Sequence, residues 1–169
     1  EEGLNKFVAV DYEGAYLLHK QGANVSHVGH LVQIPTHRTD AVISMSPEIW
    51  TVYGYENAVS INRAALRAGV NQNLLLKVVG EQDEVYTAQE GGIPFSDAVD
   101  VAKQIESLSN VNIVGVTGFY CTTYDFDNKK VIPTENMKSI KAASDLLKSQ
   151  LGLDIKHINA PGNSSCESM

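Results

Sequence analysis

The hydrophobic pattern of the chain consists of short apolar runs that alternate with longer amphipathic segments. A run of about four to eight apolar or β-branched residues is typical of a buried strand. We expect strands at residues 7–10, 26–33, 48–53, 73–79, 111–116 and 154–158. Because no hairpin turn joins two consecutive runs, the alternation predicts parallel βαβ units.

The segments between the runs carry apolar residues at helical spacing. We expect helices at residues 11–21, 39–45, 57–68, 96–108 and 134–151. Four of them begin at a residue that suits an N-cap, namely Asp11, Asn57, Ser96 and Thr134. Three are followed by a glycine, which is a common helix stop, namely Gly22, Gly69 and Gly152.

Composition narrows the class of protein. The 169 residues are 43% hydrophobic and 20% charged, as in a water-soluble domain, and the net charge of −7 argues against binding to nucleic acid. No apolar run is long enough to span a membrane, and the first residues lack the pattern of a secretory signal. Two cysteines, Cys121 and Cys166, make no disulfide framework, so we expect a reducing cytoplasm.

The number of strand-helix units favours a barrel over an open doubly wound sheet. Gly80, Gly91 and Gly92 lack the spacing of a dinucleotide-binding fingerprint. A closed (β/α)8 barrel takes at least about 200 residues. We therefore predict an α/β fold in which residues 1–169 form one incomplete domain, a partial TIM-like barrel of about strands two to seven, open at both ends. Open edges favour homo-oligomers or association through edge strands.

Candidate site residues are sought at the carboxyl ends of the strands, where parallel α/β folds place their sites. After the last expected strand come Asn159, Ser164 and Ser165, whose loop suits a phosphate; the alternative is an ordinary turn. Lys77 lies within the apolar run LLLKVV. It either points into a polar site or extends along the strand to water.

Other polar residues near strand ends are weaker candidates. We expect His27 and His30 to point to opposite faces of a strand, which excludes one shared metal and favours hydrogen-bonded core histidines. Gln33 is the better candidate in that segment. For Cys121 we expect an inert buried thiol, and no metal-ligand spacing is found. Tyr53 and Tyr120 end expected strands and could either contact a ligand or serve in packing. The charged connection at residues 120–133 is either a functional loop or a solvated one.

Three stretches together resemble a known family. They are FVAVDYEGAYLLHKQGANVSHVGHLVQIP, VNIVGVTGFYCTTYDFDNKKVIPTENM and HINAPGNSSCES. They resemble the predicted amino-acid racemase branch of the alanine racemase-like proteins, fold type III enzymes that bind pyridoxal 5′-phosphate (PLP) in a TIM-like barrel. The segments VGHLVQIP and NAP-x-x-[ST]-S-C are the most specific, and the resemblance covers nearly the whole chain.

The resemblance implies where the site parts lie. It places the lysine that binds PLP covalently before residue 1, and the last barrel strand with a β-rich domain after Met169. Ser164 and Ser165, with Asn159 near them, match positions that face the cofactor phosphate. Lys77 matches a lysine near the active site of alanine racemases. Gly118 departs from relatives, which often have a histidine there.

The function that the resemblance implies is a PLP-dependent racemase that inverts the Cα atom of an amino acid, residues 1–169 alone being inactive. One alternative is a PLP-binding protein with a regulatory role. The other is a PLP-free aldolase-type barrel in which Lys77 itself reacts with the carbonyl group of a substrate.

Overall fold

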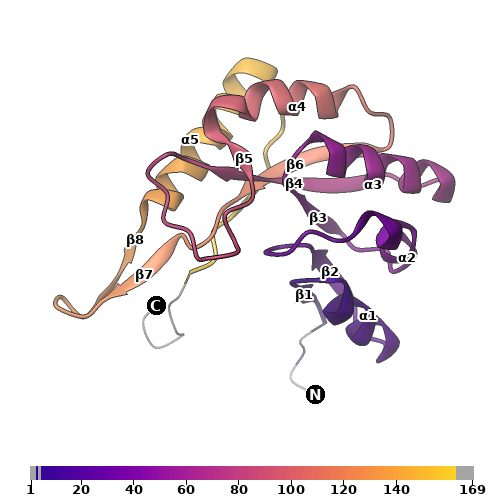
Figure 1. Cartoon of the computed structure of the whole chain (residues 1–169), viewed down its shortest axis with the longest axis horizontal. Coiled ribbons are helices and arrows are strands. Elements are labelled where there is room, and N and C mark those ends of the chain that lie inside the picture. Colours follow the sequence, from indigo (N-terminus) through magenta and orange to yellow (C-terminus); the bar gives the residue numbers. More distant parts are fainter. Residues whose placement is uncertain (1–2, 4, 163–169) are drawn as a thin grey trace.

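The sheet of the molecule is a curled arc of parallel strands with helices along its outer side (Figure 1). The structure is a computed structural model that describes residue 3 and residues 5–162. Its strands are β1 (Phe7–Ala9), β2 (Val25–Val28), β3 (Ile49–Val52), β4 (Gln72–Val79), β5 (Ile93–Pro94), β6 (Val111–Thr117), β7 (Thr122–Asp125), β8 (Lys130–Pro133) and β9 (His157–Asn159).

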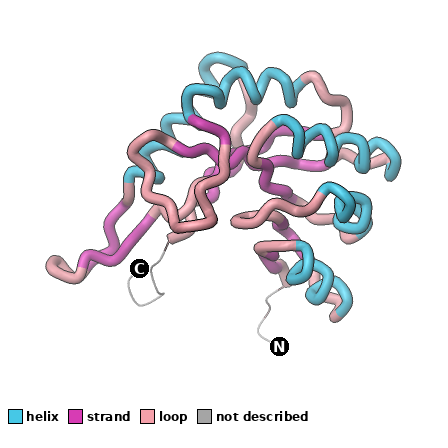
Figure 2. The backbone as a smooth tube through the Cα atoms, in the orientation of Figure 1, coloured by secondary structure: helices cyan, strands magenta, loops and turns pink. Residues whose placement is uncertain are grey.

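Helices follow most of these strands and cover the convex face of the arc (Figure 2). They are α1 (Tyr12–Lys20), α2 (Thr39–Ser44), α3 (Tyr55–Ala68), α4 (Ala98–Glu106) and α5 (Glu135–Leu151). Two short 3₁₀ helices, η1 (Thr36–Arg38) and η2 (Phe95–Asp97), lead into α2 and α4. The predicted helix-strand alternation is therefore confirmed.

The strand order is that of a partial barrel. The sheet runs β1-β2-β3-β4-β6-β9, with β5 pairing separately on β4, and each of these pairs is parallel. The predicted half-barrel is confirmed by this curled order. Strands β1 and β9 lie at the two edges of the described sheet. Association through those edges stays a prediction.

The connection between β6 and α5 contains a β-hairpin where a charged loop was expected, while the six expected strands are not joined by hairpins. Strands β7 and β8 pair antiparallel and project from the body (Figure 1). The turn is built by the Asp125 carboxylate, which accepts backbone N–H bonds from Asp127 and Asn128, each at 3.0 Å. This Asp-centred turn replaces the Gly-containing signal that sequence patterns rely on. The exposed Phe126 packs edge-to-face on Tyr124.

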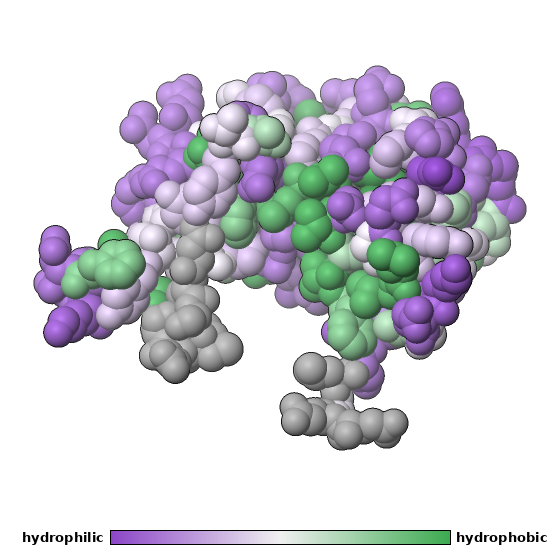
Figure 3. Space-filling view, turned by 60° about the horizontal axis from the view of Figure 1, so that its bottom comes forward, coloured by the Kyte–Doolittle hydropathy of each residue, from purple (hydrophilic) through white to green (hydrophobic). Residues whose placement is uncertain are grey.

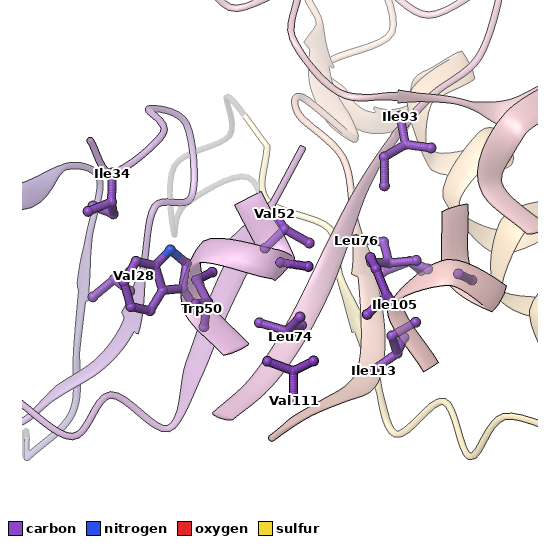
Figure 4. Packing of buried hydrophobic residues seen from close by; sticks show 14 of the residues in the cluster. Val28, Ile34, Trp50, Val52, Leu74, Leu76, Ile93, Ile105, Val111 and Ile113 are labelled. Atoms are coloured by element: carbon purple, nitrogen blue, oxygen red, sulfur yellow. The ribbon is translucent and has the colours of Figure 1, made fainter. Parts of the chain in front are cut away.

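The apolar core lies between the sheet and its helices, and strand alternation builds it. Trp50 and Val52 of β3, and Leu74 and Leu76 of β4, belong to one buried cluster with Ile105 of α4 (Figure 4). Because side chains alternate along a strand, the residues between them face the concave side. The concave set includes Thr51, Leu75 and Lys77.

Helix ends show which expected caps exist. The Asp11 carboxylate accepts the Gly14 N–H at 2.8 Å, as predicted. Asn57 does not cap, because α3 begins two residues earlier and the Asn57 amide oxygen accepts the Tyr53 N–H at 3.4 Å. Thr134 directly precedes α5, but its side chain does not cap the helix, because its hydroxyl donates to Tyr120 O at 2.6 Å. Ser96 does not cap α4, because that helix begins at Ala98.

Side chains of one kind gather on the surface. Seen from below the view of Figure 1, apolar side chains are concentrated in the middle of the face, with polar ones around them (Figure 3). The exposed apolar residues include Val8 and Val10 near β1 and Ile158 of β9. Among the described residues, no helix combines the length and the apolar composition that a membrane crossing requires.

The approach of β6 to its neighbours depends on a glycine. A Cβ atom at Gly115 would lie 2.2 Å from His157 O and 2.7 Å from Leu75 Cδ2. We expect Gly115→Ala to lower the free energy of unfolding by about 2 kcal/mol or more, because strand backbone must move. Urea unfolding followed by the fluorescence of buried Trp50 measures it.

The matched control is Gly54→Ala, because Gly54 is extended and a Cβ there meets nothing within 4 Å. The control should change the free energy of unfolding by less than about 1 kcal/mol. Equal effects of the two substitutions would contradict the close-packing explanation.

Candidate functional site

The carboxyl ends of five strands bring a set of polar side chains together on the concave side of the arc. We call this set the mouth cluster; it consists of His27, His30, Thr51, Tyr53, Lys77, Thr117 and Asn159. Register explains the grouping, since β4 pairs Lys77 with Thr117 of β6, and β6 pairs Thr117 with Asn159 of β9. The cluster therefore lies where parallel folds place their sites.

Lys77 is buried inside the mouth cluster and does not extend to water. Its side chain is 2% exposed, its ammonium donates to Gln89 O at 2.9 Å, and its Nζ lies 4.6 Å from the centre of the Tyr53 ring. Burial lowers the pKa of Lys77, and the charge of Glu90 partly opposes that shift. Of the two readings of Lys77, the structure favours the one that points into a polar region.

The two histidines lie side by side, so the expectation that they point to opposite faces was wrong. Their ring centres are 5.4 Å apart. Strand β2 ends at Val28, and Gly29 follows with a φ of +70°, which breaks the alternation that the expectation assumed. Both rings therefore turn toward the mouth. Among the described residues, no His, Cys, Asp and Glu side chains group as a metal site would require.

A directed chain of hydrogen bonds orients His30. Thr117 donates its hydroxyl to Asn159 O at 3.0 Å, so its oxygen accepts from the Asn159 amide nitrogen, also at 3.0 Å. The same amide nitrogen lies 3.4 Å from His30 Nδ1. Because an amide nitrogen only donates, Nδ1 accepts, and the neutral ring carries its proton on Nε2.

Burial keeps both imidazoles uncharged near neutral pH. Burial is the main cause that lowers the pKa of each ring to about 4. Electrostatic repulsion adds to this effect: His27 is disfavoured in its charged form by His30, and His30 by Lys77. His27 Nε2 pairs with Thr51 Oγ1 at 2.7 Å. His30 Nε2 is buried without a partner among the described residues.

An aromatic group lies beside the cluster. The His30 ring meets Phe119 edge-to-face at 6.1 Å, and Tyr86 stacks on Tyr120 at 5.1 Å. Tyr120 donates its hydroxyl to the Glu84 carboxylate, which raises the pKa of Tyr120 to about 12. Tyr53 likewise has its pKa raised to about 12, by burial. The sequence had suggested both tyrosines but not Phe119 or Tyr86.

Asn136 joins the loop after β4 to the end of β6. Its amide nitrogen donates to Glu84 O at 2.8 Å and to Phe119 O at 3.0 Å, and its amide oxygen accepts from Glu84 N at 3.1 Å. The side chain is buried at the first turn of α5. Sequence reasoning missed this residue, because a polar residue at a helix start is normally read as part of a cap.

Gly118 does not point into the mouth. A Cβ atom there would lie 2.7 Å from Ile140 Cγ2 of α5, on the helix side of the sheet. A histidine at this position would therefore meet α5 in this backbone. The imidazole closest to the aromatic group is supplied by His30, from a different strand.

The remaining candidates lie apart or outside the described residues. Gln33 reaches the rim, where its amide nitrogen lies 3.5 Å from Thr51 O. Cys121 is fully buried, and burial raises the pKa of its thiol to about 12, which agrees with an inert thiol. Ser164 and Ser165 lie outside the residues that the structure describes.

Two cavities lie near these elements. One of about 300 Å³ is on the concave side and is lined by His27, Leu75, His157 and Asn159, among others. Another of about 700 Å³ lies between the loop after β4, η2 and the start of α5, where Glu81, Glu135 and Lys138 line it. The first adjoins the mouth cluster, whereas no residue of the cluster lines the second.

Comparison with known proteins gives one family match that covers almost the whole chain. Residues 1–167 match the family described as alanine racemase, N-terminal domain. The uncharacterized protein YhfX of Escherichia coli K12 is 34% identical over 167 residues, which are 99% of this chain and 43% of that protein. The chain thus spans less than half the length of the curated relative that it matches.

Solved structures share the fold at low sequence identity. Diaminopimelate decarboxylase from M. jannaschii is similar with a TM-score of 0.71 and 13% identity, over 96% of this chain and 40% of that one. Alanine racemase from Clostridium difficile 630 is similar with a TM-score of 0.59 and 18% identity, over 97% of this chain and 50% of that one. These similarities show a common barrel.

The buried neutral histidines predict a pH-dependent stability. The unfolded chain binds more protons than the folded one between about pH 6.5 and about pH 4, so the free energy of unfolding falls as the pH is lowered through that range. We expect His27→Gln to reduce the difference in the free energy of unfolding between neutral and acidic pH by up to about 3 kcal/mol. Urea unfolding at about pH 7 and about pH 4.5 measures the difference.

Exposed His19 on α1 provides the control, since His19→Gln removes a histidine outside the buried pair and should keep the fall in stability that His27 causes. The lost bond to Thr51 lowers stability at both pH values, so only the difference between them is informative. A His27→Gln dependence identical to that of the unmodified protein would contradict the assigned cause.

Proposed function

The chain belongs to the alanine racemase N-terminal domain family, and from this membership we propose that it forms part of a PLP-dependent enzyme acting at the Cα atom of an amino acid. The observation that carries the proposal is the mouth cluster, where a buried ammonium, a buried imidazole and an aromatic group meet at the strand ends. Racemisation is the reaction that the sequence resemblance favours. Cytoplasmic location is part of the proposal, in keeping with the free thiol of Cys121.

The described residues fit the chemistry of PLP. The unpartnered His30 N–H and the Lys77 ammonium are donors for an anionic group, and Phe119 offers an aromatic face for a ring. When bound, PLP supplies an electron-withdrawing ring that stabilises negative charge at Cα. In the proposal, Ser164 and Ser165 donate to its phosphate. Asn159, whose amide nitrogen is used by Thr117 and His30, holds the His30 ring in place.

The surroundings of Lys77 give it a supporting role in this proposal. One of its three N–H groups donates to Gln89 O, and its place in the mouth cluster lets the others bind or orient a substrate group. The aldolase-type alternative would make Lys77 the covalent lysine. Borohydride reduction with PLP, followed by peptide mass spectrometry, tests the supporting role, since a PLP adduct on Lys77 would contradict it; in the PLP-free alternative the reduced adduct on Lys77 would instead carry a carbonyl substrate.

A second candidate reaction is decarboxylation at the same carbon. It is favoured by the similarity in fold to a diaminopimelate decarboxylase, with a TM-score of 0.71. Regulatory PLP binding without turnover is the remaining alternative. The three differ in what happens at Cα: inversion, loss of CO₂ or no change.

We expect the full-length protein with PLP to exchange the Cα hydrogen of an amino acid for deuterium in D₂O. Proton NMR of a panel of amino acids, beginning with alanine, measures the exchange. Exchange with loss of optical rotation supports racemisation. Release of CO₂ would support decarboxylation instead, and PLP binding with neither change would support the regulatory alternative.

We expect the double substitution Ser164→Ala and Ser165→Ala to weaken PLP binding about tenfold or more, because hydrogen bonds to a charged phosphate are each worth about 1.5–3 kcal/mol. Absorbance titration with PLP measures the affinity. Ser149→Ala is the control, since this exposed serine on α5 only bonds Leu146 O at 3.1 Å. Equal PLP affinity in all three proteins would contradict the phosphate role.

A further inference from the structure

The mouth cluster holds a buried donor that has no acceptor. The chain from Thr117 through Asn159 to His30 Nδ1 has one consistent direction, so the His30 proton lies on Nε2. The His30 side chain is 8% exposed, and Nε2 has no hydrogen-bond partner among the described residues. A buried N–H without an acceptor is costly, because the group loses its hydrogen bond to water and gains none in return.

Lys77 presents further unused donors in the same place. An ammonium has three N–H groups, of which one goes to Gln89 O and one side faces the Tyr53 ring. Among the described residues, no carboxylate lies within ion-pair distance of Lys77. Glu90 is the nearby acid, but its carboxylate accepts the Ala88 N–H at 2.9 Å.

Tyr53 links the two groups. Its ring lies beneath the Lys77 ammonium, and its hydroxyl donates to His30 O at 3.4 Å. Gln89 accepts the Lys77 bond through its backbone oxygen. Its side-chain oxygen Oε1 is a second buried atom without a hydrogen-bond partner among the described residues. The region therefore contains buried hydrogen-bonding groups that the described protein atoms leave unsatisfied, with a cation among them.

We propose that His30 Nε2 and Lys77 Nζ form an oxyanion subsite in the barrel mouth, which binds a carboxylate of the amino-acid substrate. The substrate assignment rests on the proposed function. One neutral N–H and one ammonium suit the two oxygens of a carboxylate. The phosphate of PLP is the other source of the same chemistry, but the proposal already assigns it to the loop after β9.

Binding an anion here should raise the pKa of both groups. Burial lowers the pKa of both groups in the unliganded protein, that of His30 to about 4. A bound carboxylate favours their charged forms and therefore opposes the effect of burial. The groups that face this pair are His27, Tyr53 and Glu90; His27 and Tyr53 are uncharged near neutral pH, and Glu90 carries the negative charge.

The test uses succinate, a dicarboxylate that has no amine to react with PLP, and succinamide as its uncharged analogue. Calorimetry on the full-length protein, with and without PLP, measures binding. We expect succinate to bind and succinamide not to bind. Lys77→Met and His30→Phe should each raise the Kd for succinate about tenfold or more.

Lys141→Met is the matched control, because Lys141 is exposed on α5, and it should leave the Kd unchanged. Thermal melting confirms that each variant is folded, and if Lys77→Met fails to fold, His30→Phe alone decides. The proposal is overturned if succinate does not bind the unmodified protein, or if the folded variants bind it normally.

Further measurements distinguish a cofactor phosphate from a substrate carboxylate as the bound anion. They also distinguish failure of the subsite from failure of the proposed PLP-dependent function. If Lys77→Met weakens binding of PLP but not of pyridoxal, while succinate binding is unchanged, the anion is the cofactor phosphate and the carboxylate assignment is wrong. Comparison of alanine with aspartate tells whether the α-carboxylate or a side-chain carboxylate is bound. Succinate binding in a protein that takes up no PLP would refute the proposed function and leave the subsite in place.

Discussion

Strand β4 is the constraint on which the structure depends. It pairs with β3 on one side and β6 on the other, and nearly all of its residues are buried. Its alternation sends Leu74 and Leu76 to the helices and Leu75 and Lys77 to the concave side. The register that packs Leu74 and Leu76 against the helices therefore also places Lys77 in the mouth cluster. A shift of β4 by one residue would exchange the two faces and move both sets of side chains.

The mouth is organised by directed hydrogen bonds more than by charge. Thr117 and Asn159 lie on β6 and β9 and His30 follows the end of β2, and each bond determines whether the next atom donates or accepts. The chain ends at an N–H with no acceptor, beside a lysine with no described ion-pair partner. A buried polar group in a folded protein is normally satisfied by protein, ordered water or a ligand, which is why the proposed subsite is placed at this N–H.

The parts of the fold that the sequence predicted are those in which local pattern and tertiary packing agree. The six apolar runs became the six strands of the curled sheet, with two changes in their bounds. The run at residues 26–33 pairs only over Val25–Val28, and the last strand is His157–Asn159 where residues 154–158 were expected. The hairpin of β7 and β8 was missed, because its turn contains no glycine. The Asp125 carboxylate stabilises the turn by accepting hydrogen bonds from the backbone N–H groups of Asp127 and Asn128. The Asn57 cap failed because the preceding turn uses its amide oxygen.

The sequence by itself determined the parallel α/β class, the partial barrel and the family, and it singled out a lysine within an apolar strand as a candidate, because periodicity and motif are properties of neighbouring residues. Only the tertiary structure decided that His27 and His30 lie together, that Gly118 faces a helix, and that Asn136 joins two loops. The first depends on the backbone direction after β2 has ended, and the other two depend on partners 17 to 52 residues away along the chain. Such contacts follow from how the strands curl, which no local pattern encodes.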